Sequence, residues 1–66
     1  MRVRLNGEPR EIPEGLNVSG LLAHLSVKAP RVAVEVNESV VTKDRYETEM
    51  LAPNDAIEIV AFVGGG

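Results

Sequence analysis

The sequence has 66 residues, a formal net charge of −3 and no cysteine. This length fits one domain, and the lack of cysteine excludes disulfides and cysteine-based metal sites. The acidic balance argues against nucleic-acid binding by phosphate neutralisation, and no segment approaches the length of a membrane span. We therefore expect a cytoplasmic protein without a bound cofactor or metal, monomeric when free, that binds neither nucleic acid nor membrane.

The first twelve residues predict a β-hairpin. Residues 1–5 (MRVRL) alternate between apolar and basic side chains, which is typical of a half-buried strand. Asn6-Gly7 follows, and this pair favours a type I′ turn because both central residues need positive φ. The returning strand covers residues 8–12, and Pro9 requires that it lie at an edge of the sheet.

The next segment predicts a short amphipathic helix. Asn17 is a suitable N-cap residue, while Gly20 weakens the helix by roughly 1 kcal/mol relative to alanine. We expect the helix to end near Leu25, since Pro30 prevents its continuation. Its apolar side chains form a one-sided stripe at helical spacing, made of Val18, Leu21, Leu22 and Leu25.

Two more strands and an irregular connection follow. Residues 32–36 alternate, and their inward side chains are Val32, Val34 and Val36. A turn at residues 37–38 leads to a short strand at residues 39–41. The polar stretch 42–51 predicts an irregular connection whose packing anchors are Tyr46, Met50 and Leu51.

The last strand covers residues 56–63, after a turn at residues 53–55. One of its faces carries Ile57, Ile59 and Ala61, and the other carries Glu58, Val60 and Phe62. A single helix covering one face of a mixed sheet gives a two-layer α+β domain. The element order fits a β-grasp fold of four to five strands over residues 1–62, with the first and last strands parallel and central.

The sequence is poor in catalytic groups. His24, the only histidine, falls in a helical run and predicts a surface position, because a general base needs an orienting partner and a nucleophile nearby. The carboxylates lack metal-ligand spacing. We therefore assign no catalytic residue, and we expect the chain to be acted upon by another enzyme.

The chain ends in a glycine-rich tail, residues 63–66. Glycine lets a backbone approach another surface closely, so this tail fits a slot too narrow for side chains and presents the Gly66 carboxylate at its tip. Fully extended, the tail reaches roughly 13–14 Å. A frayed terminus or an expression remnant is the alternative interpretation.

A docking surface is expected on the sheet face away from the helix. Val60 and Phe62 point there beside the tail, and exposed apolar clusters often mark an interface. Arg2 and Arg4 are expected on the adjacent strand of the same face. Alternatively, Phe62 folds against its neighbours and the arginines pair with Glu58 across the strands.

The element order, length and terminal glycines resemble the ThiS family, the ubiquitin-like sulfur carriers of thiamine thiazole synthesis. The matching segments cover nearly the whole chain: the opening strand with residues 6–8, residues 16–22, residues 31–37, and residues 54–60 on to the Gly-Gly end. Two departures are small. Asn17 stands where a threonine is common, and Gly64 adds a third glycine.

The resemblance implies a reaction cycle. An E1-like adenylyltransferase (ThiF-type) uses ATP to adenylate the Gly66 carboxylate, a sulfur donor enzyme converts the adenylate to a thiocarboxylate, and thiazole synthase (ThiG-type) takes the sulfur. Val63, Gly64 and Gly65 thread the partner active sites. The alternatives are the small subunit of molybdopterin synthase, a carrier for tRNA thiolation, a modifier that forms isopeptide bonds, and a β-grasp interaction module with an inert tail.

Overall fold

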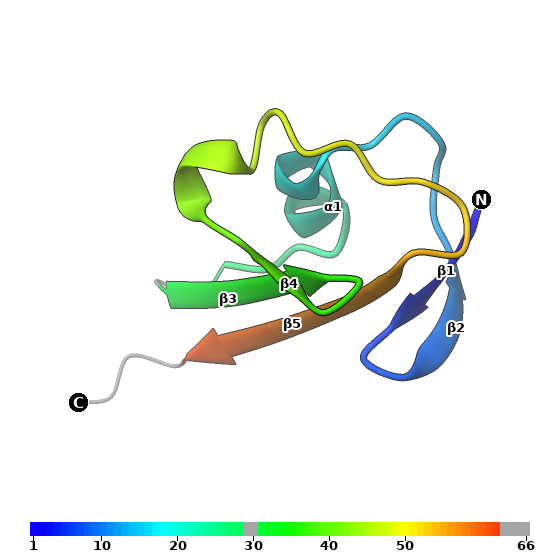
Figure 1. The fold of residues 1–66 in the computed structure, drawn as a ribbon, viewed down its shortest axis with the longest axis horizontal. Helices are drawn as coiled ribbons and strands as arrows, with labels where there is room; N and C mark the ends of the chain where they lie inside the picture. The colour runs from blue at the N-terminus through cyan, green and yellow to red at the C-terminus, as the bar shows by residue number, and fades with distance from the viewer. Residues whose placement is uncertain (29–30, 63–66) are drawn as a thin grey trace.

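A computed structural model of the protein describes residues 1–28 and 31–62. The described elements in chain order are β1 (Arg2–Leu5), β2 (Glu8–Glu11), α1 (Val18–His24), β3 (Arg31–Val36), β4 (Ser39–Val41), the 3₁₀ helix η1 (Lys43–Arg45) and β5 (Ala56–Phe62). The strands form one mixed sheet in the order β2-β1-β5-β3-β4, with α1 over one face (Figure 1). β5 is the central strand and runs parallel to β1, while the other pairings are antiparallel. The predicted β-grasp fold is confirmed.

The core lies between α1 and the sheet. Its buried side chains are Val3, Ile12, Val18, Leu21, Val34, Val36, Val41, Leu51 and Ile57. Val32, Tyr46 and Ile59 pack against them from partly buried positions. The predicted inward faces of β3 and β5 are thereby confirmed, except that Ala61 is exposed because it lies near the end of β5, beyond the buried part of that face.

Met50 is not a packing anchor, contrary to the prediction. Its side chain is 57% exposed, whereas the next residue, Leu51, is buried. Met50 forms an extended bridge with Asn17, and in extended backbone successive side chains point to opposite sides. Only one of the two neighbours can therefore face the core.

The start of α1 is held by the connection that follows β4. The Val18 N–H donates to the Glu49 carbonyl at 3.1 Å, and the Ser19 N–H donates to the Tyr46 carbonyl at 2.9 Å. The Asn17 side chain accepts a hydrogen bond from the Gly20 N–H at 2.6 Å, which confirms the predicted cap. These contacts satisfy N–H groups that the first helical turn leaves without an internal partner.

Two asparagines at hairpin turns hold β5 in the sheet. Asn6 and Asn37 both adopt positive φ, 51° and 52°, a conformation that asparagine tolerates better than most residues. The Asn6 side chain accepts from the Ile59 N–H at 2.8 Å and donates to the Ile59 carbonyl at 3.2 Å. The Asn37 side chain accepts from the Ala56 N–H at 2.9 Å. The Asn6 amide thus bonds to β5 in both directions, as a peptide group would.

The predicted position of the second strand at an edge of the sheet is confirmed. Pro9 lies in β2, an outermost strand, as its missing N–H requires. β2 ends at Glu11, one residue earlier than predicted. In the described part of the chain, no helix is long and apolar enough to cross a membrane.

Candidate functional site

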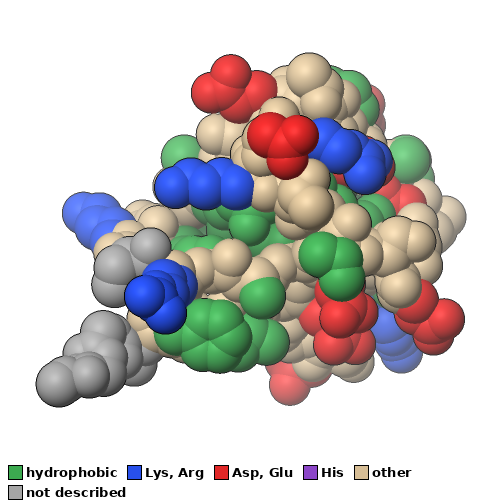
Figure 2. All heavy atoms as spheres, turned by 60° about the vertical axis from the view of Figure 1, so that its left-hand side comes forward, with side chains coloured by type: hydrophobic (Ala, Val, Ile, Leu, Met, Phe, Trp, Pro, Cys, Tyr) green, Lys and Arg blue, Asp and Glu red, His purple; other side chains and the backbone are tan. Residues whose placement is uncertain are grey.

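Exposed apolar side chains gather on the sheet face that α1 does not cover. Val60 and Phe62 are 51% and 50% exposed, and the antiparallel pairing of β3 with β5 places Ala33 opposite Val60. We call Ala33, Val60 and Phe62 the outer patch. Figure 2 shows hydrophobic surface beside basic side chains at this end of the molecule. An exposed apolar cluster of this kind is typical of an interaction surface.

The outer patch lies on the part of β5 that extends past β1. On one side β5 pairs with β3 as far as Phe62. On the other side the ladder with β1 ends at the pair Leu5–Ile57, and the Asn6 side chain extends it only to Ile59. The last three described residues of β5 therefore have one strand neighbour within the described chain, and β5 points away from the β1–β2 hairpin (Figure 1).

The two predicted arginines do not join the outer patch. Arg4 stands beside Ala56 at the start of β5, and Val60 lies four residues further along, about 13 Å at the rise of a strand. Arg2 lies further still from the patch, with its Nε 3.4 Å from Glu11 Oε1 across the β1–β2 hairpin. Because β1 runs parallel to β5, its basic side chains meet the beginning of β5 and not its end.

The alternative pairing of the arginines with Glu58 is wrong for the described residues. The described ion pair of Arg2 is with Glu11, and Arg4 takes part in no ion pair among those found in the described chain. Glu58 stands directly opposite Glu35 of β3 instead. Two carboxylates in this arrangement repel each other.

The basic residue that accompanies the outer patch is Arg31, which the sequence analysis missed. Arg31 pairs directly with Phe62 in the β3–β5 ladder. The sequence contains the information for this pair: if the inward valines of β3 are aligned with Ile57 and Ile59 of β5, Arg31 falls opposite Phe62. Both side chains are exposed.

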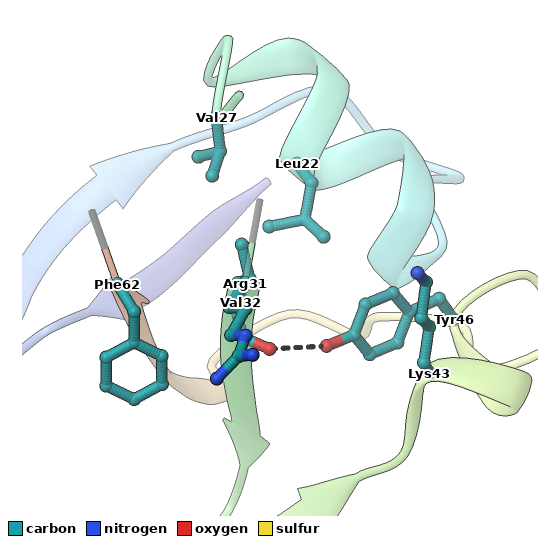
Figure 3. Close-up of a pocket in the computed structure, with 7 residues that line it drawn as sticks. All are labelled: Leu22, Val27, Arg31, Val32, Lys43, Tyr46 and Phe62. Carbon is teal, nitrogen blue, oxygen red and sulfur yellow. Dashed lines mark hydrogen bonds between the residues drawn. The ribbon is translucent and has the colours of Figure 1, made fainter. Parts of the chain in front are cut away.

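A groove opens beside the outer patch, at the end of the sheet where β3 begins and β5 ends. Its volume is about 600 Å³, and its lining residues are Leu22, Val27, Arg31, Val32, Lys43, Tyr46 and Phe62 (Figure 3). The Tyr46 hydroxyl donates to the Val32 carbonyl at 3.2 Å, which fixes the aromatic ring against β3. We call this feature the basic groove, because two cationic side chains and no acidic one are found among the described residues that line it.

Asp44 follows Lys43 in the chain but does not line the basic groove. Its carboxyl is fully exposed, and hydrogen bonds from the Thr42 side chain and from its own backbone N–H hold its pKa below the usual range, with a smaller contribution from Arg45. The carboxyl is therefore ionised at neutral pH and stays in water.

The described residues offer little for direct chemistry. Within residues 1–28 and 31–62, no three His, Asp or Glu side chains lie close enough together to hold a metal ion. His24 is exposed at the C-terminal end of α1, as predicted. The predicted sulfur-attachment residue Gly66 and the threading residues Val63, Gly64 and Gly65 lie outside the described residues.

Comparisons with known proteins agree with this fold. The sequence model of the ThiS family matches residues 3–66. The chain is 42% identical over 66 residues to a thiazole synthase of Magnetococcus marinus, covering 100% of this chain but 20% of that protein. It is 36% identical over 64 residues to the sulfur carrier protein ThiS of Thermus thermophilus, covering 97% of this chain and 98% of that one.

A solved structure is also similar. The crystal structure of a thiamine biosynthesis protein (ThiS) from Geobacter metallireducens superposes with a TM-score of 0.86, at 36% identity and with 100% of both chains covered. The family match includes the terminal glycines, and the thiazole synthase relative is about five times longer than this chain. The chain belongs to the ThiS family.

Proposed function

We propose that this protein is a sulfur carrier of thiamine biosynthesis whose Gly66 carboxylate is the attachment point for sulfur. The observation that carries the proposal is the family match, which runs through the glycine tail to residue 66. Relatives named as ThiS sulfur carriers support it, and so does the geometry of β5, whose exposed end leads into the tail.

The chemistry follows from the carboxylate. A free α-carboxylate is ionised at pH 7 and is a poor electrophile. Its oxygen attacks the α-phosphorus of ATP on an E1-like enzyme, which releases pyrophosphate and leaves an acyl-adenylate. Sulfur at the oxidation level of sulfide, supplied by the sulfur donor enzyme, then attacks the acyl carbon. The C–S bond forms as the bond to AMP breaks, which leaves a thiocarboxylate, a nucleophilic sulfur on a tether. The carrier supplies the reacting group and its delivery, and the partner enzymes supply the catalysis.

Thiazole synthase is the partner that accepts the sulfur in this proposal. A relative named thiazole synthase contains a segment 42% identical to the whole of this chain. Proteins that act together are often found joined in one polypeptide, since a covalent link raises the local concentration of one for the other. The adenylating enzyme and the sulfur donor enzyme are the further partners.

The outer patch is the proposed docking surface. A partner that admits the tail must lie over the end of β5, where Val60 and Phe62 are half exposed. Arg4 lies about 13 Å away on the same face and Arg2 lies further still, and both are assigned to the rim of the interface. Apolar side chains at the centre and charges at the rim are the usual arrangement of a protein interface.

Deletion of Gly65 and Gly66 together tests the carrier function, because removal of Gly66 alone would leave a chain that still ends in two glycines and a free carboxylate. The wild-type chain is incubated with the E1-like enzyme, ATP and a sulfur source, and a thiol-selective alkylating reagent traps the product for intact-protein mass spectrometry. We expect a trapped sulfur on the wild type and none on the deletion variant. Exchange of oxygen for sulfur changes the mass almost as methionine oxidation does. Met50 is 57% exposed, so a Met50→Leu variant is the matched control. A trapped sulfur on the deletion variant would refute the assignment.

Truncation of Phe62 tests the docking surface. We expect Phe62→Ala to raise the Kd for the E1-like enzyme or for thiazole synthase at least about fivefold, because truncation of a central aromatic side chain typically costs more than about 1 kcal/mol at an interface. The control is Val40→Ala, which truncates another exposed apolar side chain, on β4 (64% exposed). Equal effects of the two substitutions would contradict a docking surface centred on β5.

A further inference from the structure

The basic groove lies next to the proposed docking surface, and its described lining residues belong to the domain that precedes the tail. Leu22 and Val27 border it from the helix side, and Lys43 and Tyr46 border it from η1 and the residue after it (Figure 3). Phe62 belongs both to this groove and to the outer patch. A protein placed over the outer patch therefore also lies over the groove.

The groove combines an apolar floor with a cationic border. Leu22, Val27 and Val32 are partly buried and supply aliphatic surface. Arg31 and Lys43 are exposed, and neither takes part in an ion pair among those found in the described residues. In a chain with a formal charge of −3, this is a local reversal of sign, and Figure 2 shows basic side chains around the hollow. The groove is complementary to an apolar side chain flanked by carboxylates.

The shape of the groove favours a protein segment over a small molecule. Arg31, Lys43 and Phe62 form its border and are all exposed, so a small ligand would remain partly in water. Small-molecule sites usually bury most of the ligand. A segment of a larger partner covers the groove with the rest of its own surface and excludes water from the charged contacts.

We propose that the basic groove receives an acidic segment of thiazole synthase that carries an apolar side chain, as a second contact beside the tail. This inference rests on the proposed function, because it takes thiazole synthase as the partner. The apolar side chain packs on the aliphatic floor, and the carboxylates pair with Arg31 and Lys43. The contact fixes the rotation of the carrier about the axis of β5, which contact with the tail alone leaves free.

Charge reversal at the border of the groove tests the proposal. The Kd for thiazole synthase from the same organism is measured by isothermal titration calorimetry with the wild type, Lys43→Glu, and the double variant Arg31→Glu/Lys43→Glu. The control is Arg10→Glu, the same change of charge at an exposed position on β2, in the opposite edge of the sheet. We expect Lys43→Glu to weaken binding by about tenfold and the double variant by more, since a charge of the wrong sign at an interface costs binding free energy. The control should change Kd by less than about twofold.

The salt dependence provides a second readout. Binding of the wild type should weaken as the ionic strength rises, whereas binding of the double variant should strengthen, because screening reduces the attraction in the wild type and the repulsion in the variant. Unchanged affinity of the double variant, or an equal loss in the Arg10→Glu control, would overturn the proposal.

Failure of this inference is separable from failure of the proposed function. All variants are also tested for a trappable sulfur on Gly66, a reaction that does not involve thiazole synthase. A wild type that gains sulfur but does not bind thiazole synthase overturns the groove assignment and leaves the carrier function standing. A wild type that gains no sulfur rejects the carrier function itself.

Discussion

The two halves of β5 are built differently. Its first half, Ala56–Ile59, is held on both sides. On one side it pairs with β3 and bonds to Asn37, and on the other it pairs with β1 and bonds to Asn6. Ile57 in this half is 1% exposed, whereas Val60 and Phe62 in the second half are 51% and 50% exposed. The second half pairs with β3 alone within the described chain.

Along this one strand, the first half contributes mainly to the stability of the fold and the second half is available for binding. Burial of apolar area is the main favourable contribution to folding, and it is concentrated in the first half. The second half keeps its apolar side chains in water, where they are available to a partner. Truncation of a buried side chain in the first half should therefore destabilise the fold, and truncation of an apolar side chain in the second half should change binding while the fold persists.

Truncation of Ile57 should produce the largest effect on stability. Ile57→Ala removes a fully buried side chain and should lower the free energy of unfolding by about 2–5 kcal/mol, measured by urea denaturation followed by circular dichroism. Phe62→Ala is the matched change in the second half and should cost about 1 kcal/mol or less, because half of that side chain is already in water. Similar costs for the two variants would remove the distinction between the halves.

Loss of the Asn6 side chain should shorten the part of β5 that is held on both sides, because this side chain holds Ile59. Asn6→Gly keeps the positive φ of the turn without strain and removes both hydrogen bonds to Ile59. We expect the free energy of unfolding to fall by about 1–2 kcal/mol and the Ile59 amide to exchange with solvent faster. Hydrogen exchange followed by NMR measures both, with the Ala56 amide, which is held by Asn37, as the internal control. Unchanged exchange at Ile59 would contradict the role given to Asn6.

Charge reversal at Glu58 should have the smallest effect, and in the stabilising direction. Glu58 stands opposite Glu35 on the exposed sheet face, and like charges at such a position cost roughly 0.2–1 kcal/mol. Glu58→Lys should therefore raise the free energy of unfolding, and the gain should shrink as salt is added. A loss of stability at low salt would show that Glu58 makes a favourable contact within the domain.

The sequence predicted the elements better than their alignment. The strands, the capped helix, the Asn6-Gly7 turn and the edge position of Pro9 follow from alternation, capping and backbone preferences, which act over a few residues. Met50 was assigned to the core wrongly, since hydrophobicity alone does not say which of two neighbours faces inward. In the candidate site, the exposure of Val60 and Phe62 followed from alternation along one strand.

The sequence patterns did not predict the register of neighbouring strands or how far one strand extends along another. The distance of Arg2 and Arg4 from the outer patch depends on how far β1 extends along β5. The pairing of Arg31 with Phe62 depends on the register of β3 against β5. A register shift of one residue exchanges the faces of a whole strand, so these positions are fixed only when the complete core is packed.

By itself, the sequence determined the fold class, the family resemblance and the tail as the reactive candidate, because local patterns and the order of elements carry that information. The tertiary structure decided which side chains share a surface: it separated the predicted arginines from the outer patch, placed Arg31 beside Phe62 and formed the basic groove from residues of α1, β3, η1 and β5. The physical reason is that a surface joins residues far apart in the chain, and their proximity is set by packing of the shared core.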